Sequence, residues 1–297
     1  MIDITPEAEL FHQFGNFEEV EYLDLMEHIL SNGEEKTDRT GVGTKSIFHA
    51  TMNFDLTNNT IPLLTTKKMA WKSIVSELLW FLEGSDDERR LAEIHYGKPR
   101  EELTEKKTIW TDNAENQGKS LGYDDGILGP IYGVQWRDWN GNDQVAKLIK
   151  DLRDNPQSRR HILSAWNVDD LDKMALPPCH MFAQFSVVKN RYLECALYQR
   201  SCDMFLGVPF NIASYSLLTH IIAKQTRLEA GRLYWIGGDC HVYNNHFDVV
   251  NEQIRRTPYT FPKLKINPVK YIENYDVDDF ELTNYTHYDK LTAPMAI

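Results

Sequence analysis

The chain has 297 residues, of which 42% are hydrophobic and 26% are charged, and its formal net charge is −12. This composition excludes a wholly disordered chain, and no apolar run reaches the roughly 18 residues of a membrane span. An acidic chain is a poor partner for duplex nucleic acid, which binds through surplus Lys and Arg. The four cysteines form no Cys-x-x-Cys pair, and no secretory signal follows Met1. We therefore expect a cytoplasmic protein without a disulfide scaffold.

Apolar residues at helical spacing predict two helices in the first third of the chain. The first covers residues 22–30 and ends at an Asn-Gly pair. The second begins near Lys68, ends at Gly84 and carries Glu77 inside its apolar stripe. Residues 86–107 are charged and irregular, and they predict a small helical insert.

The second half of the chain mixes strands and helices without regular alternation. The predicted elements are a helix over 143–153, a strand over 160–166, a hairpin of 182–188 and 192–199, a helix over 211–228, a strand over 233–237 and a helix over 241–254. This order favours an α+β fold over a doubly wound one. No linker divides the chain, so we expect a single domain over 1–297.

The sharpest local motif is Pro177-Pro178-Cys179-His180, in which two prolines fix the backbone ahead of a cysteine. Nearby cations lower the pKa of a thiol and make it a nucleophile, and Arg159, Arg160 and Arg200 are candidates for that role. Taken by itself, a single cysteine is more often an inert, small apolar residue.

Three further motifs each allow two interpretations. The segment of Arg39 with Gly41 and Gly43 is either a glycine turn or an anion site. The segment 199–203 is either a surface turn with a local ion pair or a phosphate site, because a guanidinium fork matches phosphate oxygens. Asn211 is either a helix N-cap or an amide that complements the N3–H and O4 edge of uracil.

Two features near the C-terminus are less specific. His241 and Tyr243 have no partner ligands at helical spacing, so we expect no metal. The apolar end, residues 293–297, is frayed, tucked against the fold, or a lid.

Together, the motifs resemble the thymidylate synthase family from about residue 20 to the C-terminus, and residues 110–123 are most similar to phage members. The matching segments are Asp38-Arg39-Thr40-Gly41, Thr65-Thr66-Lys67-Lys68, Glu77-Leu78-Leu79-Trp80-Phe81, Leu128-Gly129-Pro130-Ile131-Tyr132-Gly133, Ser158-Arg159-Arg160, Leu176-Pro177-Pro178-Cys179-His180, Tyr198-Gln199-Arg200-Ser201-Cys202-Asp203 and Leu206-Gly207-Val208-Pro209-Phe210-Asn211-Ile212-Ala213-Ser214-Tyr215.

The resemblance implies reductive methylation of dUMP to dTMP, with 5,10-methylenetetrahydrofolate as carbon and hydride donor and dihydrofolate as the second product. Cys179 would add to C6 of the uracil, and Tyr132 would help to remove the C5 proton. The other implied catalytic positions are Glu77, His180 and Asn211 around the pyrimidine O4, and Trp110 beside the folate ring.

The resemblance also implies the ligand-binding residues and the assembly. The implied dUMP ligands are Arg39, Arg159, Arg160, Arg200, Ser201, Asp203, Asn211, His241 and Tyr243, and the implied folate ligands are Lys67, Trp110, Asp203 and Ile297. Arg159 and Arg160 would reach across from the partner subunit. The implied fold is a mixed sheet flanked by helices that forms a homodimer through the sheet face.

The chain departs from the family pattern at several positions. Thr111 stands where the family has an acidic residue after the tryptophan, and His49 stands where it has Gly. Residues 288–292 replace a His-Pro-x-Ile-Lys segment of the tail, which closes over the cofactor in the family. Because an altered lid could admit water, a dUMP hydroxymethylase that releases tetrahydrofolate is the alternative.

Overall fold

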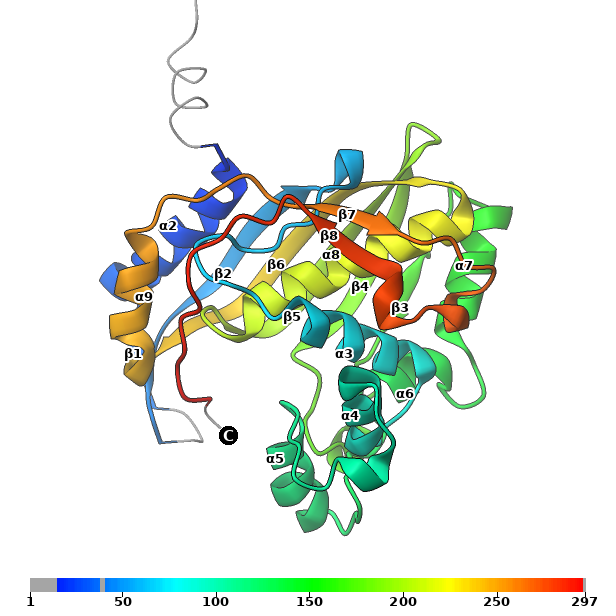
Figure 1. The fold of residues 1–297 in the computed structure, drawn as a ribbon, viewed down its shortest axis with the longest axis horizontal. Coiled ribbons are helices and arrows are strands. Elements are labelled where there is room, and N and C mark those ends of the chain that lie inside the picture. Colours follow the sequence, from blue (N-terminus) through cyan, green and yellow to red (C-terminus); the bar gives the residue numbers. More distant parts are fainter. Residues whose placement is uncertain (1–14, 38–40, 296–297) are drawn as a thin grey trace, which may run out of the picture.

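The computed structural model describes residues 15–37 and 41–295, and its centre is a six-stranded sheet in the order β1-β2-β6-β5-β4-β3 (Figure 1). β5 and β6 run parallel, and the other neighbouring strands are antiparallel. The strands are β1 (Glu34–Lys36), β2 (Thr44–Asp55), β3 (Ile162–Ser164), β4 (His180–Val188), β5 (Tyr192–Asp203) and β6 (Glu229–Tyr243). The expected α+β fold with a mixed sheet is confirmed.

Helices cover one face of this sheet. α8 (Gly207–Thr226) packs against β5 and β6, is buried along most of its length, and makes the crossover that joins these two parallel strands. α2 (Phe17–Asn32) packs on β2, and α3 (Trp71–Glu83) packs against α8. The remaining elements are α4 (Glu88–Tyr96), α5 (Thr111–Asn113), α6 (Tyr132–Arg137), α7 (Gln144–Asp154), α9 (Phe247–Ile254), β7 (Lys263–Ile266) and β8 (Phe280–Thr283).

The two faces of the sheet differ in burial. Inward residues such as Leu197 on β5 and Phe185 on β4 are fully buried, and their neighbours point the other way. On that outer face Phe182, Tyr234 and Ile162 keep 37%, 38% and 46% of their surface exposed. The helical layer therefore builds the core, whereas the outer sheet face presents apolar side chains to solvent.

Several predicted elements are confirmed. The helices expected at 22–30, 68–84 and 143–153 correspond to α2, α3 and α7. The predicted hairpin is β4–β5, and Lys189 and Asn190 in its turn have φ of 53° and 52°. Positive φ at both central residues is what a type I′ turn requires.

Three boundaries were wrong. The strand expected at 233–237 extends through Tyr243, because its last residues pair with β2, so α9 begins at Phe247 rather than at 241. α8 begins at Gly207, four residues early, so Asn211 lies inside the helix and the N-cap interpretation is wrong. The strand expected over 160–166 pairs only as β3.

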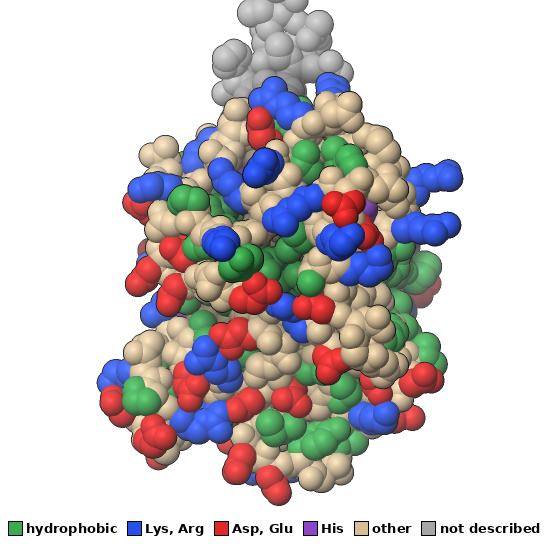
Figure 2. All heavy atoms as spheres, turned by 90° about the vertical axis from the view of Figure 1, so that its right-hand side faces the viewer, with side chains coloured by type: hydrophobic (Ala, Val, Ile, Leu, Met, Phe, Trp, Pro, Cys, Tyr) green, Lys and Arg blue, Asp and Glu red, His purple; other side chains and the backbone are tan. Residues whose placement is uncertain are grey.

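Within residues 15–37 and 41–295, no helix combines the length and apolarity that crossing a membrane needs. Figure 2 shows basic and acidic side chains interspersed on the face that it draws. Acidic side chains predominate in its lower half, and basic ones are more frequent above. Acidic and basic side chains are thus unevenly distributed on this face.

Candidate active site

Cys179 lies directly before β4, and its backbone is held from two sides. Its N–H donates to the hydroxyl of Tyr132 at an N···O distance of 2.7 Å. Its carbonyl accepts from the N–H of Arg200 at 2.8 Å. The side chain is half-buried. α6 and β5 therefore fix the position of the thiol, while a path from solvent remains.

The guanidinium of Arg200 is held beside this cysteine by the two prolines that precede it. Nε donates to the carbonyl of Pro178 at 2.8 Å, and Nη2 donates to the carbonyl of Pro177 at 2.9 Å. The ring of Trp166 lies 5.5 Å from the guanidinium carbon. The rigid Pro-Pro backbone thus sets the direction of the arginine as well as that of the cysteine.

The electrostatic environment of Cys179 contains opposing effects. Burial raises the pKa of the thiol above its usual range, whereas the charge of Arg200 and hydrogen bonds with Ser201 and Tyr132 lower it in part. Burial has the larger effect. In the isolated chain, the pKa of the thiol therefore stays above its usual range despite the charge of Arg200.

Several aromatic rings pack against one another next to Cys179. Tyr132 stacks on His180 with ring centroids 4.1 Å apart, and Trp110 lies 6.0 Å from Tyr132. Nδ1 of His180 lies 2.9 Å from the hydroxyl of Tyr215. Because burial lowers the pKa of His180 to about 3, its imidazole is neutral and acts through hydrogen bonds rather than charge.

Glu77 is a buried carboxyl on α3 whose hydrogen-bond donor is an indole. Nε1 of Trp110 donates to Oε1 of Glu77 at 2.7 Å. Burial raises the pKa of Glu77 to about 7, although the bond from Trp110 lowers it in part. A carboxyl with a pKa near neutrality can exchange a proton at physiological pH, which is typical of functional sites.

The amide of Asn211 is oriented by a residue to which sequence reasoning gave no role. Nε2 of Gln199 donates to Oδ1 of Asn211 at 3.0 Å, and Nε1 of Trp235 donates to Oε1 of Gln199 at 3.0 Å. These bonds direct the NH2 of Asn211 away from Gln199. The available signal was a glutamine at an inward position of a strand, since a buried amide needs partners.

Asp203 and Lys67 meet at the turn between β5 and α8. Oδ1 of Asp203 accepts from the N–H groups of Phe205 and Leu206 at 3.0 and 3.1 Å. Nζ of Lys67 donates to the carbonyl of Phe205 and lies 3.6 Å from the centroid of its ring. Burial lowers the pKa of Lys67 to about 7, against the charges of Asp203 and Glu19. Lys67 thus supports this turn, and its contact with folate stays a prediction.

His241 and Tyr243 lie on one face of β6, two residues apart, with ring centroids separated by 5.2 Å. Nδ1 of His241 lies 3.0 Å from Oδ1 of Asp239, and the ammonium of Lys36 donates to the other carboxylate oxygen, Oδ2, at 3.1 Å. Across the described ranges no three His, Cys, Asp or Glu side chains gather as metal ligands would.

Two of the arginines expected at the site do not join this cluster within one chain. Arg159 and Arg160 are exposed next to β3, at the edge of the sheet. Arg39 and Ile297 lie outside the described residues. At the glycine turn, Gly41 and Gly43 have φ of 75° and 79°, the left-handed conformation that favours glycine.

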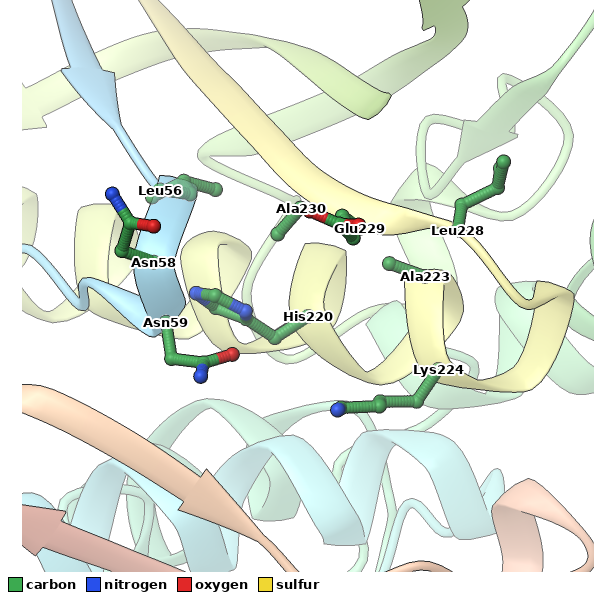
Figure 3. A pocket seen from close by; sticks show the side chains of 9 residues that line it. All are labelled: Leu56, Asn58, Asn59, His220, Ala223, Lys224, Leu228, Glu229 and Ala230. Atoms are coloured by element: carbon green, nitrogen blue, oxygen red, sulfur yellow. The ribbon is translucent and has the colours of Figure 1, made fainter. Parts of the chain in front are cut away.

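A pocket of about 300 Å³ lies apart from Cys179, between α8, the start of β6 and the turn η1 (Thr57–Asn59). Figure 3 shows His220 pointing from α8 toward Asn58 and Asn59. Nε2 of His220 lies 2.8 Å from the carbonyl of Thr60. The residues that line this pocket do not include those of the cysteine cluster.

Two comparisons with known proteins match most of the chain. The family model described as thymidylate synthase matches residues 20–297. A protein of Escherichia phage T5 named probable thymidylate synthase is 47% identical over 283 residues, which cover 93% of this chain and 99% of that protein. The chain therefore belongs to the thymidylate synthase family.

Proposed function

We propose that the chain converts dUMP and 5,10-methylenetetrahydrofolate to dTMP and dihydrofolate. The observation that carries the proposal is the half-buried thiol of Cys179, which lies among Arg200, Ser201 and the hydroxyl of Tyr132 in a member of this family. A nucleophile, a cation for the phosphate and a hydroxyl for proton transfer are the groups that this reaction needs.

Cys179 forms a bond to C6 of the pyrimidine, which makes C5 a carbon nucleophile. C5 then bonds to the methylene carbon of the folate, and Tyr132 acts with water in removing the C5 proton. The bond between the methylene carbon and the folate nitrogen then breaks, and tetrahydrofolate leaves. It returns a hydride that completes the methyl group, and breaking of the S–C6 bond releases Cys179. The reduction of the methylene is balanced by oxidation of tetrahydrofolate to dihydrofolate.

The uracil is recognised by groups that the site holds in fixed directions. Asn211 offers a donor to O4 and an acceptor to N3–H. The bond from Gln199 orients its amide and leaves the NH2 group and one lone pair of Oδ1 available. Glu77 and the neutral His180 organise hydrogen bonds around O4, where negative charge develops. Arg200 and Ser201 bind the phosphate, and His241 and Tyr243 bind the ribose.

The folate binds on the side of Trp110. Trp110 packs against its ring, and Asp203 binds the pterin. Lys67 lies near its tail, and Ile297 closes over it. The two N–H bonds that Asp203 accepts orient its carboxylate at the start of α8. Arg39 completes the dUMP phosphate site.

We propose a homodimer that forms through the outer sheet face. Phe182, Tyr234 and Ile162 keep between 37% and 46% of their surface exposed there. An apolar face of this kind is typical of an interface between subunits. Across a two-fold axis, Arg159 and Arg160 of each subunit reach the phosphate in the other. They add the cations that Cys179 needs, and the dimer acts in the cytoplasm.

The deciding experiment follows dihydrofolate absorbance with dUMP and 5,10-methylenetetrahydrofolate, and identifies the nucleotide product by mass. We expect dihydrofolate and dTMP in equal amounts. Formation of 5-hydroxymethyl-dUMP without dihydrofolate would establish the hydroxymethylase alternative, which neither comparison favours.

A substitution tests the nucleophile. Cys179→Ser is expected to lower turnover by roughly 10³-fold or more while dUMP still binds, because serine lacks an activated thiolate. Cys195→Ser is the matched control, since Cys195 is fully buried and takes no part in the reaction. Full turnover by Cys179→Ser would contradict the assignment.

A further inference from the structure

Glu88, the first residue of α4, is 1% exposed, and its carboxylate accepts four hydrogen bonds. Nε and Nη2 of Arg89 donate to its two oxygens, each at 2.6 Å. The hydroxyls of Thr108 and Thr111 both donate to Oε1 at 2.6 Å. A buried carboxylate is tolerated only with such partners, so this geometry is closely specified.

The two threonines lie on either side of Trp110. The N–H of Trp110 donates to Oγ1 of Thr108 at 3.1 Å, and the N–H of Thr108 donates to Oγ1 of Thr111 at 2.8 Å. The indole of Trp110 donates in turn to Glu77 at 2.7 Å. The carboxylate of Glu88 thus holds the turn from which Trp110 projects, two hydrogen bonds away from the backbone N–H of Trp110.

The start of α4 also holds residues 126–128, at the far end of the segment that begins at Thr108. The N–H of Glu88 donates to the carbonyl of Gly126 at 2.9 Å, and the N–H of Leu128 donates to the carbonyl of Asp86 at 3.0 Å. Leu128 lies four residues before Tyr132, the residue that contacts Cys179. Residues 86–88 therefore fix both ends of the segment 108–128, which lies beside α4 in Figure 1.

Arg89 also bonds to residues 103–106, which connect α4 to this turn. Nη1 donates to the carbonyls of Leu103 and Lys106 at 3.2 and 2.9 Å, and Nη2 donates to Oγ1 of Thr111 at 3.2 Å. Its side chain keeps only 18% of its surface exposed. A guanidinium fork with this many carbonyl and hydroxyl partners has one available orientation.

We propose that Glu88, held by Arg89, is a positioning residue that sets the placement of Trp110 in the active site. The proposal rests on the proposed function for its catalytic consequence, and on geometry for its structural one. The family has an acidic residue directly after the tryptophan, and this chain has Thr111 there. Glu88 supplies a carboxylate to the same turn from α4. The charged segment 86–107 is then part of the active-site support rather than surface decoration.

The test replaces Glu88 by Gln, which keeps its size and removes its charge. Arg90→Gln is the matched control, because Arg90 lies two residues along α4 and its partners Glu83 and Glu93 are remote from the turn. One readout is hydrogen exchange of the Trp110 indole N–H, assigned by its loss in Trp110→Phe. The other readouts are kcat, the KM for dUMP and the pH profile of dTMP formation.

We expect Glu88→Gln to speed exchange of the indole N–H on the order of ten-fold, because the turn opens locally. We expect kcat to fall on the order of ten-fold, since a misplaced positioning group costs rate rather than nucleotide affinity. The limb of the pH profile assigned to Glu77 should move to higher pH as the bond from Trp110 weakens. Arg90→Gln should leave the exchange rate and kcat within about two-fold of those of the original chain, and the pH profile unchanged.

Unchanged indole exchange, an unchanged pH profile, or equal effects of Glu88→Gln and Arg90→Gln would overturn the proposal. If the original chain makes no dTMP, the proposed function fails, and the exchange measurement still decides the role of Glu88. If Glu88→Gln does not fold, Thr111→Val removes one of the two hydroxyls and is judged on the same readouts.

Discussion

The carboxyl of Glu77 makes folding sensitive to pH. Its pKa in the folded chain is about 7, against an ordinary 4.5, because it is buried and 7% exposed. The folded chain therefore binds this proton more tightly than the unfolded chain does. Stability from this group is complete below about pH 4.5 and is lost as pH rises through about 7.

Glu77→Gln should remove this loss. At pH 8 we expect the variant to gain up to about 3 kcal/mol in free energy of unfolding relative to the original chain, and at pH 4.5 almost none. Urea unfolding at several pH values measures the difference. Glu83→Gln at the end of the same helix is the control, because Glu83 is 40% exposed and paired with Arg90. A gain independent of pH would contradict the assigned pKa.

Sequence motifs identified the residues around Cys179 but not those that orient them. Gln199 and Glu88 act through partners that are distant along the chain, such as Trp235 and Thr111. Such pairs become visible only when strands and helices are placed side by side. Burial of Lys67 beneath the turn of Phe205 was equally hidden, because its sequence neighbours are polar.

At the scale of elements, the C-terminal tail is held at several points. The hydroxyl of Tyr285 donates to the carbonyl of Leu64 at 2.7 Å, and the N–H of Tyr288 donates to the carbonyl of Thr65 at 2.8 Å. Nε2 of His246 lies 2.8 Å from the carbonyl of Pro294. His246 is fully buried, and its ring lies 5.6 Å from that of Phe205. Pro294 in the tail thus lies beside the turn that carries Asp203.

His246→Phe keeps most of the volume and removes the bond to Pro294. Because losing a buried hydrogen bond costs about 1–3 kcal/mol, we expect the end of the tail to detach more often. Protease cleavage within the tail, between residue 285 and the C-terminus, should become faster. The fraction of 5-hydroxymethyl-dUMP in the product should rise as water gains access to the active site.

His220→Phe is the matched control for this experiment. His220 is also buried and also bonded to a backbone carbonyl at 2.8 Å, but it lies at the pocket of Figure 3 rather than at the tail. It should lose similar stability without a change in cleavage or product. Equal effects of the two variants would show that the tail responds to stability alone.

The elements themselves were predictable where periodicity was strong. α7 and the β4–β5 hairpin have apolar residues at clear helical and alternating spacing. The boundary at residue 241 failed because pairing of His241 with Ser46 on β2 extends the strand. Sequence spacing near one strand carries no information about a partner strand so far away in the chain.

At the scale of the whole molecule, the proposed dimer makes each site depend on two chains. Neither Cys179→Ser nor Arg160→Ala should turn over efficiently alone. When the two are unfolded together and refolded as an equal mixture, half of the dimers are mixed and contain one intact site. We expect about a quarter of the original activity to return.

In the control experiment, Arg191→Gln takes the place of Arg160→Ala in the mixture. Arg191 is exposed in the hairpin turn and paired with Glu229. It should be active without any mixing. Absence of recovered activity in the first mixture, with dimers confirmed by light scattering, would place Arg160 outside the partner's site.

The order of strands also determines how long β2 waits for its partner strand during synthesis. β2 pairs with β6 between Thr44 and Tyr243, so about 200 residues separate the two partners. At roughly 5–20 residues per second, β2 is made about 10–40 seconds before β6 leaves the ribosome. During that interval β1 and β2 form at most a hairpin with an unpaired edge, which is exposed to wrong pairing. The nascent chain is therefore most vulnerable to aggregation before its last fifth emerges.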